Sequence, residues 1–159
     1  MLNIKLISIG SLKEQYLKDA IAEYTKRLSA FCSFEILELK EYKLPDCPSQ
    51  SDVERALRDE AERIKKSIPQ KAYKIALCVE GKQYSSEELA KRIEDISQIS
   101  GTVCFIIGSS HGLSEEIKNI SDLRLSVSKL TFPHQLMRVM MLEIIYRALN
   151  ISKGTKYHK

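Results

Sequence analysis

Apolar runs of strand length alternate with longer segments of helical periodicity along the whole chain, and this alternation restricts the fold more than any other feature. Apolar residues spaced by three and four predict amphipathic helices, whereas short apolar runs bounded by turn residues predict strands. The expected strands cover residues 2–9, 34–39, 73–79, 102–107 and 123–127. The expected helices cover residues 12–28, 53–68, 85–96 and 133–149, with a short one after Ser114.

Two of the expected strands, 73–79 and 102–107, are apolar on both faces. Strands of this kind belong to parallel sheets that are covered by helices on both sides. The chain has 159 residues, of which 43% are hydrophobic, and this is enough for one substantial core. We therefore expect a single α/β domain over residues 1–159, with a mostly parallel sheet and helices on both faces.

Helix starts are predicted from capping patterns. Ser11 with Glu14, Ser51 with Glu54 and Ser85 with Glu88 each have the serine and glutamate spacing of a capping box. Ser114 is expected to open the short helix, and Pro133 suits the first position of the last helix.

Several classes of protein are disfavoured by composition. Apolar runs stay below the roughly 18 residues that cross a bilayer, and the first ten residues lack a cleavage pattern. The four cysteines contain no zinc-type pair, so we expect reduced thiols, a cytoplasmic protein and no metal site. The net charge of +4 is compatible with RNA binding without demanding it.

Three loops follow the ends of expected strands, at residues 77–82, 107–112 and 127–135. Ligands of open parallel sheets bind beyond these carboxyl ends. The glycine loop at 108–112 matches neither a Walker motif nor a dinucleotide fingerprint, which leaves an adenosine ligand open. Leu130 and Phe132 are apolar where a loop is normally polar. They fit either a buried loop or a cover for the faces of an adenine ring.

The chain ends in a basic segment, residues 151–159. It fits either a frayed tail or a strap that carries Lys156, Tyr157 and His158 to RNA. Nine extended residues span roughly 30 Å, which is far enough to reach a neighbouring subunit.

Six stretches of the sequence carry a resemblance to one family. They are residues 7–13, 77–82, 105–113, 130–135, 146–148 and 157–159. In these stretches and in its overall length the chain resembles the ribosomal RNA large subunit methyltransferase H family, of the SPOUT class. The resemblance implies a C-terminal trefoil knot that holds S-adenosylmethionine, a homodimer with its active site at the interface, and methylation of N3 of a pseudouridine in 23S ribosomal RNA on the assembled ribosome.

The resemblance also assigns residues to the cofactor. Two adjacent glycines are usual in the family where this chain has Gly108 and Ser109, which leaves the backbone torsion at Ser109 open. The residues expected to hold the cofactor are Leu77, Gly108, Val127, Ser128, Lys129, Leu130, Thr131 and Phe132.

Catalysis needs the acceptor to lose its imide proton and its developing charge to be stabilised. His134 and His158 are candidate bases, although His134 equally fits a helix-start residue bonded to backbone. Arg147 fits either an anion-stabilising role or a pair with Glu143.

Tyr157 joins these residues as the fourth catalytic candidate, and Arg138, one turn past His134, is expected to meet RNA. Two alternatives remain open. One is a non-catalytic RNA-binding protein with a retained methyltransferase fold, and the other is an enzyme that uses a different adenosine cofactor.

Overall fold

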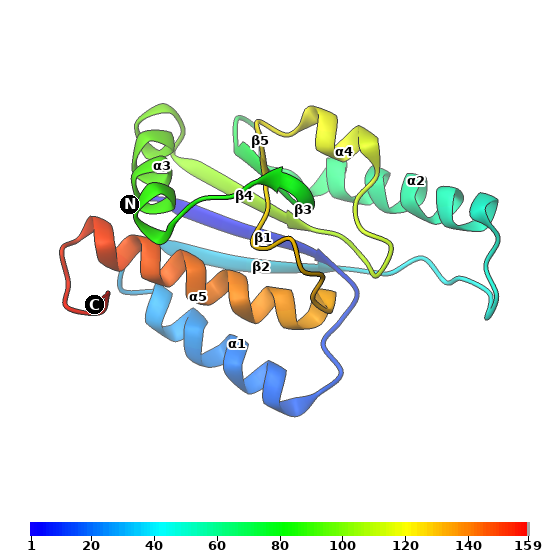
Figure 1. Ribbon diagram of the computed structural model, residues 1–159, viewed down its shortest axis with the longest axis horizontal. Coiled ribbons are helices and arrows are strands. Elements are labelled where there is room, and N and C mark those ends of the chain that lie inside the picture. The colour runs from blue at the N-terminus through cyan, green and yellow to red at the C-terminus, as the bar shows by residue number, and fades with distance from the viewer. Residues whose placement is uncertain (159) are drawn as a thin grey trace.

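Five parallel strands form one sheet in the order β2-β1-β4-β3-β5 in the computed structural model, which describes residues 1–158 (Figure 1). The strands are β1 (Asn3–Ile9), β2 (Ser33–Leu39), β3 (Tyr73–Lys82), β4 (Thr102–Ile107) and β5 (Leu123–Leu125). The helices are α1 (Gln15–Leu28), α2 (Gln50–Ser67), α3 (Ser86–Ile99), α4 (Glu115–Ile120) and α5 (His134–Ser152). The order of elements predicted from the sequence is confirmed, and so is the parallel sheet.

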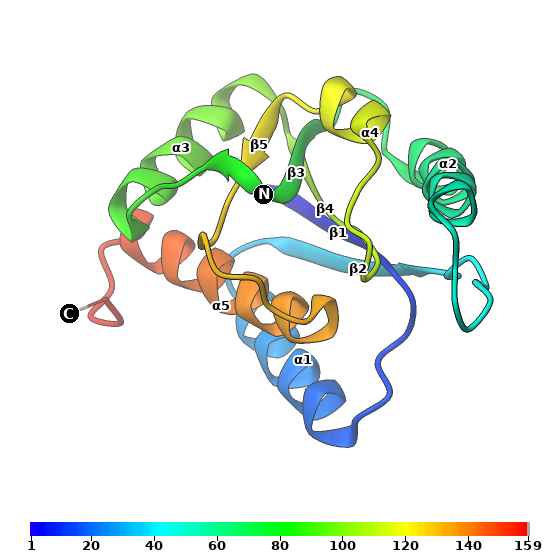
Figure 2. The same cartoon turned by 45° about the vertical axis from the view of Figure 1, so that its right-hand side comes forward.

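The alternation of side chains along each strand divides the core into two layers. Ile4 and Leu6 of β1 point into one layer with α3 and α5, whereas Ile7 and Ile9 point into the other with α2 and α4. Figures 1 and 2 show the same division, with α1, α3 and α5 over one face of the sheet and α2 and α4 over the other. Helices therefore cover both faces, as the apolar strands predicted.

The long strand β3 binds β5 twice. Leu125 pairs with Leu77 and again with Lys82, because β3 bends between these two residues. The amide of Ser126 then donates to the carbonyl of Lys82 at 2.9 Å. Two stretches of β3 thus hold β5, and the chain leaves β5 on a fixed path toward α5 (Figure 2).

Glycine is required at the second crossing. A Cβ built on Gly81 would lie 2.7 Å from the backbone carbon of Leu125 and 2.8 Å from the carbonyl of Arg124. Backbone atoms in a paired strand cannot move away as the end of a flexible side chain does. Any residue larger than glycine would therefore force β3 and β5 apart.

The helix caps show where the sequence patterns succeed and fail. The capping box of Ser85 and Glu88 is present, and the Ser114 side chain caps α4. The predicted box at Ser11 is wrong, because α1 begins at Gln15 and residues 10–14 form a loop. The box before α2 is formed by Ser49 and Asp52, two residues earlier than predicted.

Pro133 precedes the last helix as its cap, because α5 begins one residue later, at His134. Within residues 1–158, none of the helices has the length and apolar character to span a membrane.

We expect Gly81→Ala to lower the free energy of unfolding by about 2 kcal/mol or more, the cost of forcing an atom into packed structure. Gly101→Ala is the matched control, because a Cβ at Gly101 meets nothing within 4 Å. Urea unfolding of both variants measures the difference. Equal stability of the two variants would show that the second β3–β5 contact is not rigid.

Candidate functional site

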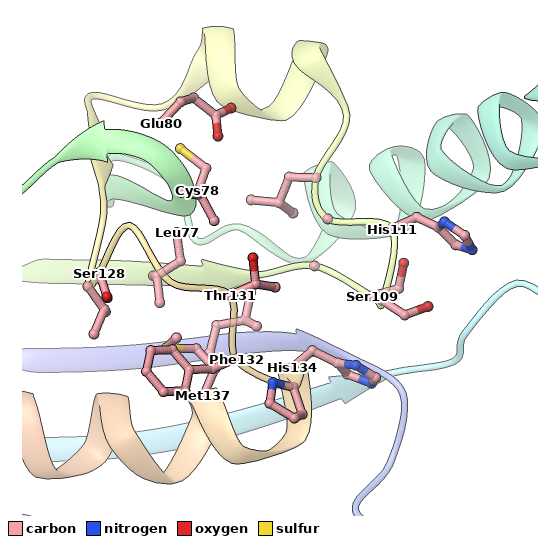
Figure 3. A pocket seen from close by; sticks show the side chains of 18 of the residues that line it. Leu77, Cys78, Glu80, Ser109, His111, Ser128, Thr131, Phe132, His134 and Met137 are labelled. Carbon is pink, nitrogen blue, oxygen red and sulfur yellow. The ribbon is translucent and has the colours of Figure 1, made fainter.

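A cavity of about 750 Å³ opens beyond the carboxyl ends of β3, β4 and β5 (Figure 3). Its size lies within the range of small-molecule and cofactor sites. It combines apolar side chains with hydroxyl groups, two histidines and the charged side chains of Glu80 and Lys118. It is lined by Leu77, Cys78, Val79, Glu80, Ile107, Gly108, Ser109, Ser110, His111, Gly112, Leu113, Lys118, Leu125, Val127, Ser128, Leu130, Thr131, Phe132, Pro133, His134 and Met137.

All the residues predicted to hold the cofactor line this cavity except Lys129, whose side chain is exposed to solvent and does not belong to the lining. They come from the three segments that the sequence singled out, residues 77–82, 107–112 and 127–135. The prediction of a loop at 77–82 is wrong, because these residues continue β3. Figure 3 shows Leu77 facing Thr131 and Phe132, with Met137 beside Phe132. Met137 packs against the hydrophobic core and also forms part of the cavity wall.

The loop after β5 is shaped by its serines. The Ser126 hydroxyl donates to the carbonyl of Ser128 at 3.0 Å, and the amide of Leu130 donates to the Ser128 hydroxyl at 3.0 Å. This turn leaves the Leu130 side chain 71% exposed at the cavity. The interpretation of Leu130 as part of a buried loop is therefore wrong, and its apolar side chain is exposed to solvent at the edge of the cavity.

Gly108 lets the two ends of the 108–112 loop come into close contact. A Cβ at Gly108 would lie 2.1 Å from the carbonyl oxygen of Gly112, so no other residue fits. The loop closes through the amide of Gly112, which donates to the carbonyl of Ser109 at 2.9 Å. Gly112 itself has a φ of 78°, a conformation that glycine adopts without strain. The 108–112 loop thus presents its backbone to the cavity.

Ser109 anchors this loop to α2. Its hydroxyl donates to the Glu60 carboxylate at 3.0 Å, and both side chains are buried. The Tyr42 amide donates to the other oxygen of Glu60 at 3.3 Å. Lys71 is the one non-glycine residue with positive φ in the described part of the chain, so Ser109 adopts an ordinary backbone conformation. Serine therefore replaces glycine here without strain and gains a hydrogen bond.

Burial raises the pKa of the Glu60 carboxyl above its usual value, and the hydrogen bonds from Tyr42 and Ser109 lower it in part. Glu60 lies on the apolar stripe of α2, three residues after Leu57 and four before Ile64. An acidic residue within such a stripe indicates a buried polar anchor, and Glu60 could have been predicted from this pattern.

His134 lies between this cavity and a second one. Figure 3 shows its ring extending from the start of α5 toward the end of β1. Burial lowers the pKa of His134 below its usual value, and the nearby Arg138 guanidinium lowers it further. The imidazole is therefore neutral at neutral pH and able to accept a proton. Within residues 1–158 no hydrogen bond engages its ring, contrary to the backbone-bonded alternative.

Arg138 is buried, with 1% of its surface exposed, so the prediction that it meets RNA is wrong. Its guanidinium donates to the carbonyl of Ile9 at 2.6 Å and to the Glu38 carboxylate at 3.3 Å. Like Glu60, it is a charged residue on an otherwise buried helix face, since Met141 and Leu142 follow it at helical spacing. The structure gives this cation a role inside the protein.

The three remaining catalytic candidates lie at the other end of α5. Arg147 pairs with Glu143, as one of its two interpretations predicted, and the Tyr157 hydroxyl donates to Glu143 at 2.9 Å. His158 contacts Glu87 on α3 at 2.7 Å. Arg147 is thirteen residues after His134 in one helix, or roughly 20 Å along its axis. Within one chain these groups therefore do not join His134.

The terminal segment up to residue 158 is held in place. The amide of Thr155 donates to the carbonyl of Asn150 at 3.1 Å, and its hydroxyl donates to the Asn150 side chain at 2.6 Å. The Tyr157 ring packs against Tyr146 with 4.8 Å between ring centroids. The interpretation of a frayed tail is wrong for these residues, and Lys159 lies outside the described part of the chain.

The cysteines in this structure are free thiols, and Cys78 contributes its side chain to the cavity wall. Residues 1–158 contain no cluster of three or more histidine, cysteine or acidic side chains arranged to hold a metal ion.

A parallel sheet with helices on both faces and a cofactor-sized cavity beyond its carboxyl edge defines an open-sheet α/β protein with a candidate ligand site. A solved structure from Haemophilus influenzae Rd KW20, described as a "probable methylase family protein", shares this fold with a TM-score of 0.51. The match covers 99% of this chain and 70% of that one, at 13% sequence identity.

A family model described as "Predicted SPOUT methyltransferase" matches residues 2–158, and the chain belongs to this family. A protein of Streptococcus pneumoniae (strain CGSP14) named "Ribosomal RNA large subunit methyltransferase H" is 48% identical over 99% of this chain and 100% of its own length. A protein of Methanococcus maripaludis, which carries the same name in provisional form, is 50% identical over the same shares. The resemblance found in the sequence is confirmed.

We expect Ser109→Ala to lower the free energy of unfolding by about 1–3 kcal/mol, since it leaves a buried carboxylate short of a donor. Ser110→Ala, at the exposed neighbouring position, is the matched control. Because the pKa of Glu60 is raised in the folded state, ionisation of Glu60 lowers the free energy of unfolding as pH rises. The hydrogen bond from Ser109 lowers this pKa, so its removal makes the ionisation more costly. The loss should therefore be larger at about pH 8 than at about pH 5 in urea titrations. A loss that does not change with pH would contradict the role assigned to Glu60.

Proposed function

We propose that this protein transfers a methyl group from S-adenosylmethionine to 23S ribosomal RNA, at N3 of a pseudouridine, on the assembled ribosome in the cytoplasm. The observation that carries the proposal is the cavity beyond the carboxyl edge of the sheet, lined by all but one of the residues predicted for this cofactor. Family membership supports the methyl-transfer chemistry, and the names of the relatives support the RNA substrate.

The cavity fits the cofactor by shape and chemistry. The 108–112 loop leaves no space for a Cβ at Gly108, so backbone groups are able to approach a nucleoside closely. Leu77, Val127 and Phe132 supply apolar surface for an adenine ring, and the serine-shaped turn at 126–130 supplies polar groups at its edge. S-adenosylmethionine supplies a methyl group already activated by its sulfonium.

The protein must position the acceptor and remove its proton. We assign the uptake of the acceptor's N3 proton to His134, whose ring is neutral and reaches the boundary of the cavity. His134 would take up the N3 proton, so that the acceptor nitrogen keeps an electron pair for the methyl group that the bound donor would supply. The neutral state of His134 is maintained by its burial and by the cation of Arg138.

A second copy of the chain completes this proposal. Arg147 lies roughly 20 Å from His134 along α5. Tyr157 contacts Glu143 and Tyr146 at the same end of that helix, so a partner subunit must bring its own Arg147, Tyr157 and His158 to the cavity. Leu130 and Val79 line the cavity yet are 71% and 49% exposed, and a partner would cover them. We further propose that the double pairing of β3 with β5 forms part of a trefoil knot.

Purified protein with radiolabelled S-adenosylmethionine and large ribosomal subunits tests the proposal. We expect label in 23S ribosomal RNA, located by mass spectrometry at one pseudouridine. A protein lacking residues 155–159 should bind the cofactor with unchanged affinity in calorimetry and lose transfer by at least roughly 100-fold, since the groups that position the acceptor would be absent. Failure of the intact protein to bind S-adenosylmethionine would favour the RNA-binding alternative. Competition by ATP or NAD for the cavity would favour an enzyme that uses another adenosine cofactor. Full transfer by the protein that lacks residues 155–159 would show that these residues have no role in the reaction.

A further inference from the structure

A second cavity, of about 570 Å³, lies beyond the carboxyl ends of β1 and β2. It shares His134 with the cavity assigned to the cofactor, so one titratable side chain borders both spaces. Methyl transfer requires the donor and acceptor sites to adjoin, and His134 marks where these two do. The second cavity is lined by Gly10, Ser11, Lys13, Glu38, Leu39, Lys40, Glu41, His134 and Gln135.

One carboxylate in this cavity is held in a defined orientation. Glu38, the penultimate residue of β2, has one oxygen, Oε1, 3.3 Å from the buried Arg138 guanidinium. Arg138 is itself fixed by its hydrogen bond to the Ile9 carbonyl. The Glu38 side chain is 39% exposed, and in the described residues its second oxygen takes part in no hydrogen bond. The second oxygen of Glu38 is therefore a preorganised hydrogen-bond acceptor at the cavity, and the Arg138 guanidinium balances the charge of the carboxylate.

The two carboxylates that line the cavity favour a ligand that donates hydrogen bonds to them. Glu38 and Glu41 are both acidic, and a Cβ built on Gly10 would lie 3.4 Å from Glu41, 3.7 Å from Arg138 and 4.0 Å from His134. The two carboxylates disfavour a phosphate beside them, whereas Lys13 and Lys40 also line the cavity and supply the cations that RNA phosphates need.

Pseudouridine differs from uridine by the group that such a carboxylate recognises. Its base is joined to the sugar through carbon, so N1 keeps a hydrogen, whereas N1 of uridine is bonded to the sugar. The N1–H and N3–H groups flank one carbonyl and leave the ring in different directions. A base with N3 toward His134 thus has a second N–H available for an acceptor elsewhere in the cavity.

We propose that the second cavity receives the acceptor base and that Glu38 selects pseudouridine by accepting its N1–H. This inference rests on the proposed function. Arg138 acts as a positioning residue that turns one Glu38 oxygen toward the base. With uridine in the cavity this carboxylate would face a C–H group and remain unpaired, which is the kind of mismatch that rejects an analogue strongly.

The variant Glu38→Gln tests the proposal with little change in shape. Arg138 donates hydrogen bonds, so it retains the amide oxygen and turns the amide NH₂ group toward the base. An acceptor is thereby replaced by a donor opposite N1–H. The matched control is Glu35→Gln on the same strand, since Glu35 is 63% exposed and pairs with Lys5 outside both cavities.

The substrates are large ribosomal subunits with pseudouridine at the methylated position, and subunits with uridine there, from cells lacking the isomerase that forms it. For each protein the ratio of the two transfer rates is measured, because partial unfolding lowers both rates and leaves their ratio unchanged. We expect a strong preference for pseudouridine in the wild type and in Glu35→Gln, and a ratio at least ~10-fold smaller in Glu38→Gln, with unchanged S-adenosylmethionine affinity.

An unchanged ratio in Glu38→Gln would overturn the role of Glu38. Equal transfer to both substrates by the wild type would overturn the selection while leaving the methyltransferase assignment intact. Transfer to neither, with or without cofactor binding, would instead show that the proposed function itself is wrong.

Discussion

The double pairing of β5 with β3 is the constraint on which the site depends. Leu125 is bound by Leu77 before the bend in β3 and by Lys82 after it, and Gly81 lets the two backbones touch. The chain that leaves β5 must then return across the carboxyl edge of the sheet to begin α5 at His134. This return path brings the 126–133 loop opposite the 108–112 loop, and the cavity is the space between them. The path of the backbone therefore determines where the cavity lies, and the side chains of these loops form its lining.

Two buried charges support this backbone from either side. Glu60 on α2 fixes the glycine loop through Ser109, and Arg138 on α5 fixes the end of β1 through Ile9. A buried charge is costly unless its partners are well placed, so each residue strongly favours a single arrangement of its loop. Both lie on helix faces that are otherwise apolar. Their shared effect is to fix backbone at the carboxyl edge of the sheet, after β4 for Glu60 and at the end of β1 for Arg138.

The sequence predicted the parts of the fold that depend on local pattern. Alternation of apolar runs located every strand and the parallel sheet, and the three segments chosen as a candidate site, residues 77–82, 107–112 and 127–135, line one cavity. Arg138 was misjudged because its partner Glu38 is one hundred residues away, and helical spacing alone does not reveal such a pair. Capping patterns failed at Ser11, where the loop lines a cavity instead of starting a helix. Lys129 was assigned with its neighbours, yet the turn at Ser128 leaves it in solvent.

Hydrogen exchange followed by mass spectrometry, with and without S-adenosylmethionine, tests most directly whether the returning loop and the glycine loop enclose the cofactor. We expect slower exchange in residues 77–80, 107–113 and 126–134, where backbone amides meet the ligand or lose their access to solvent. Exchange in α1 and in the outer turns of α2 should stay unchanged. Protection confined to other segments, or no protection under saturating cofactor, would contradict the assignment of this cavity.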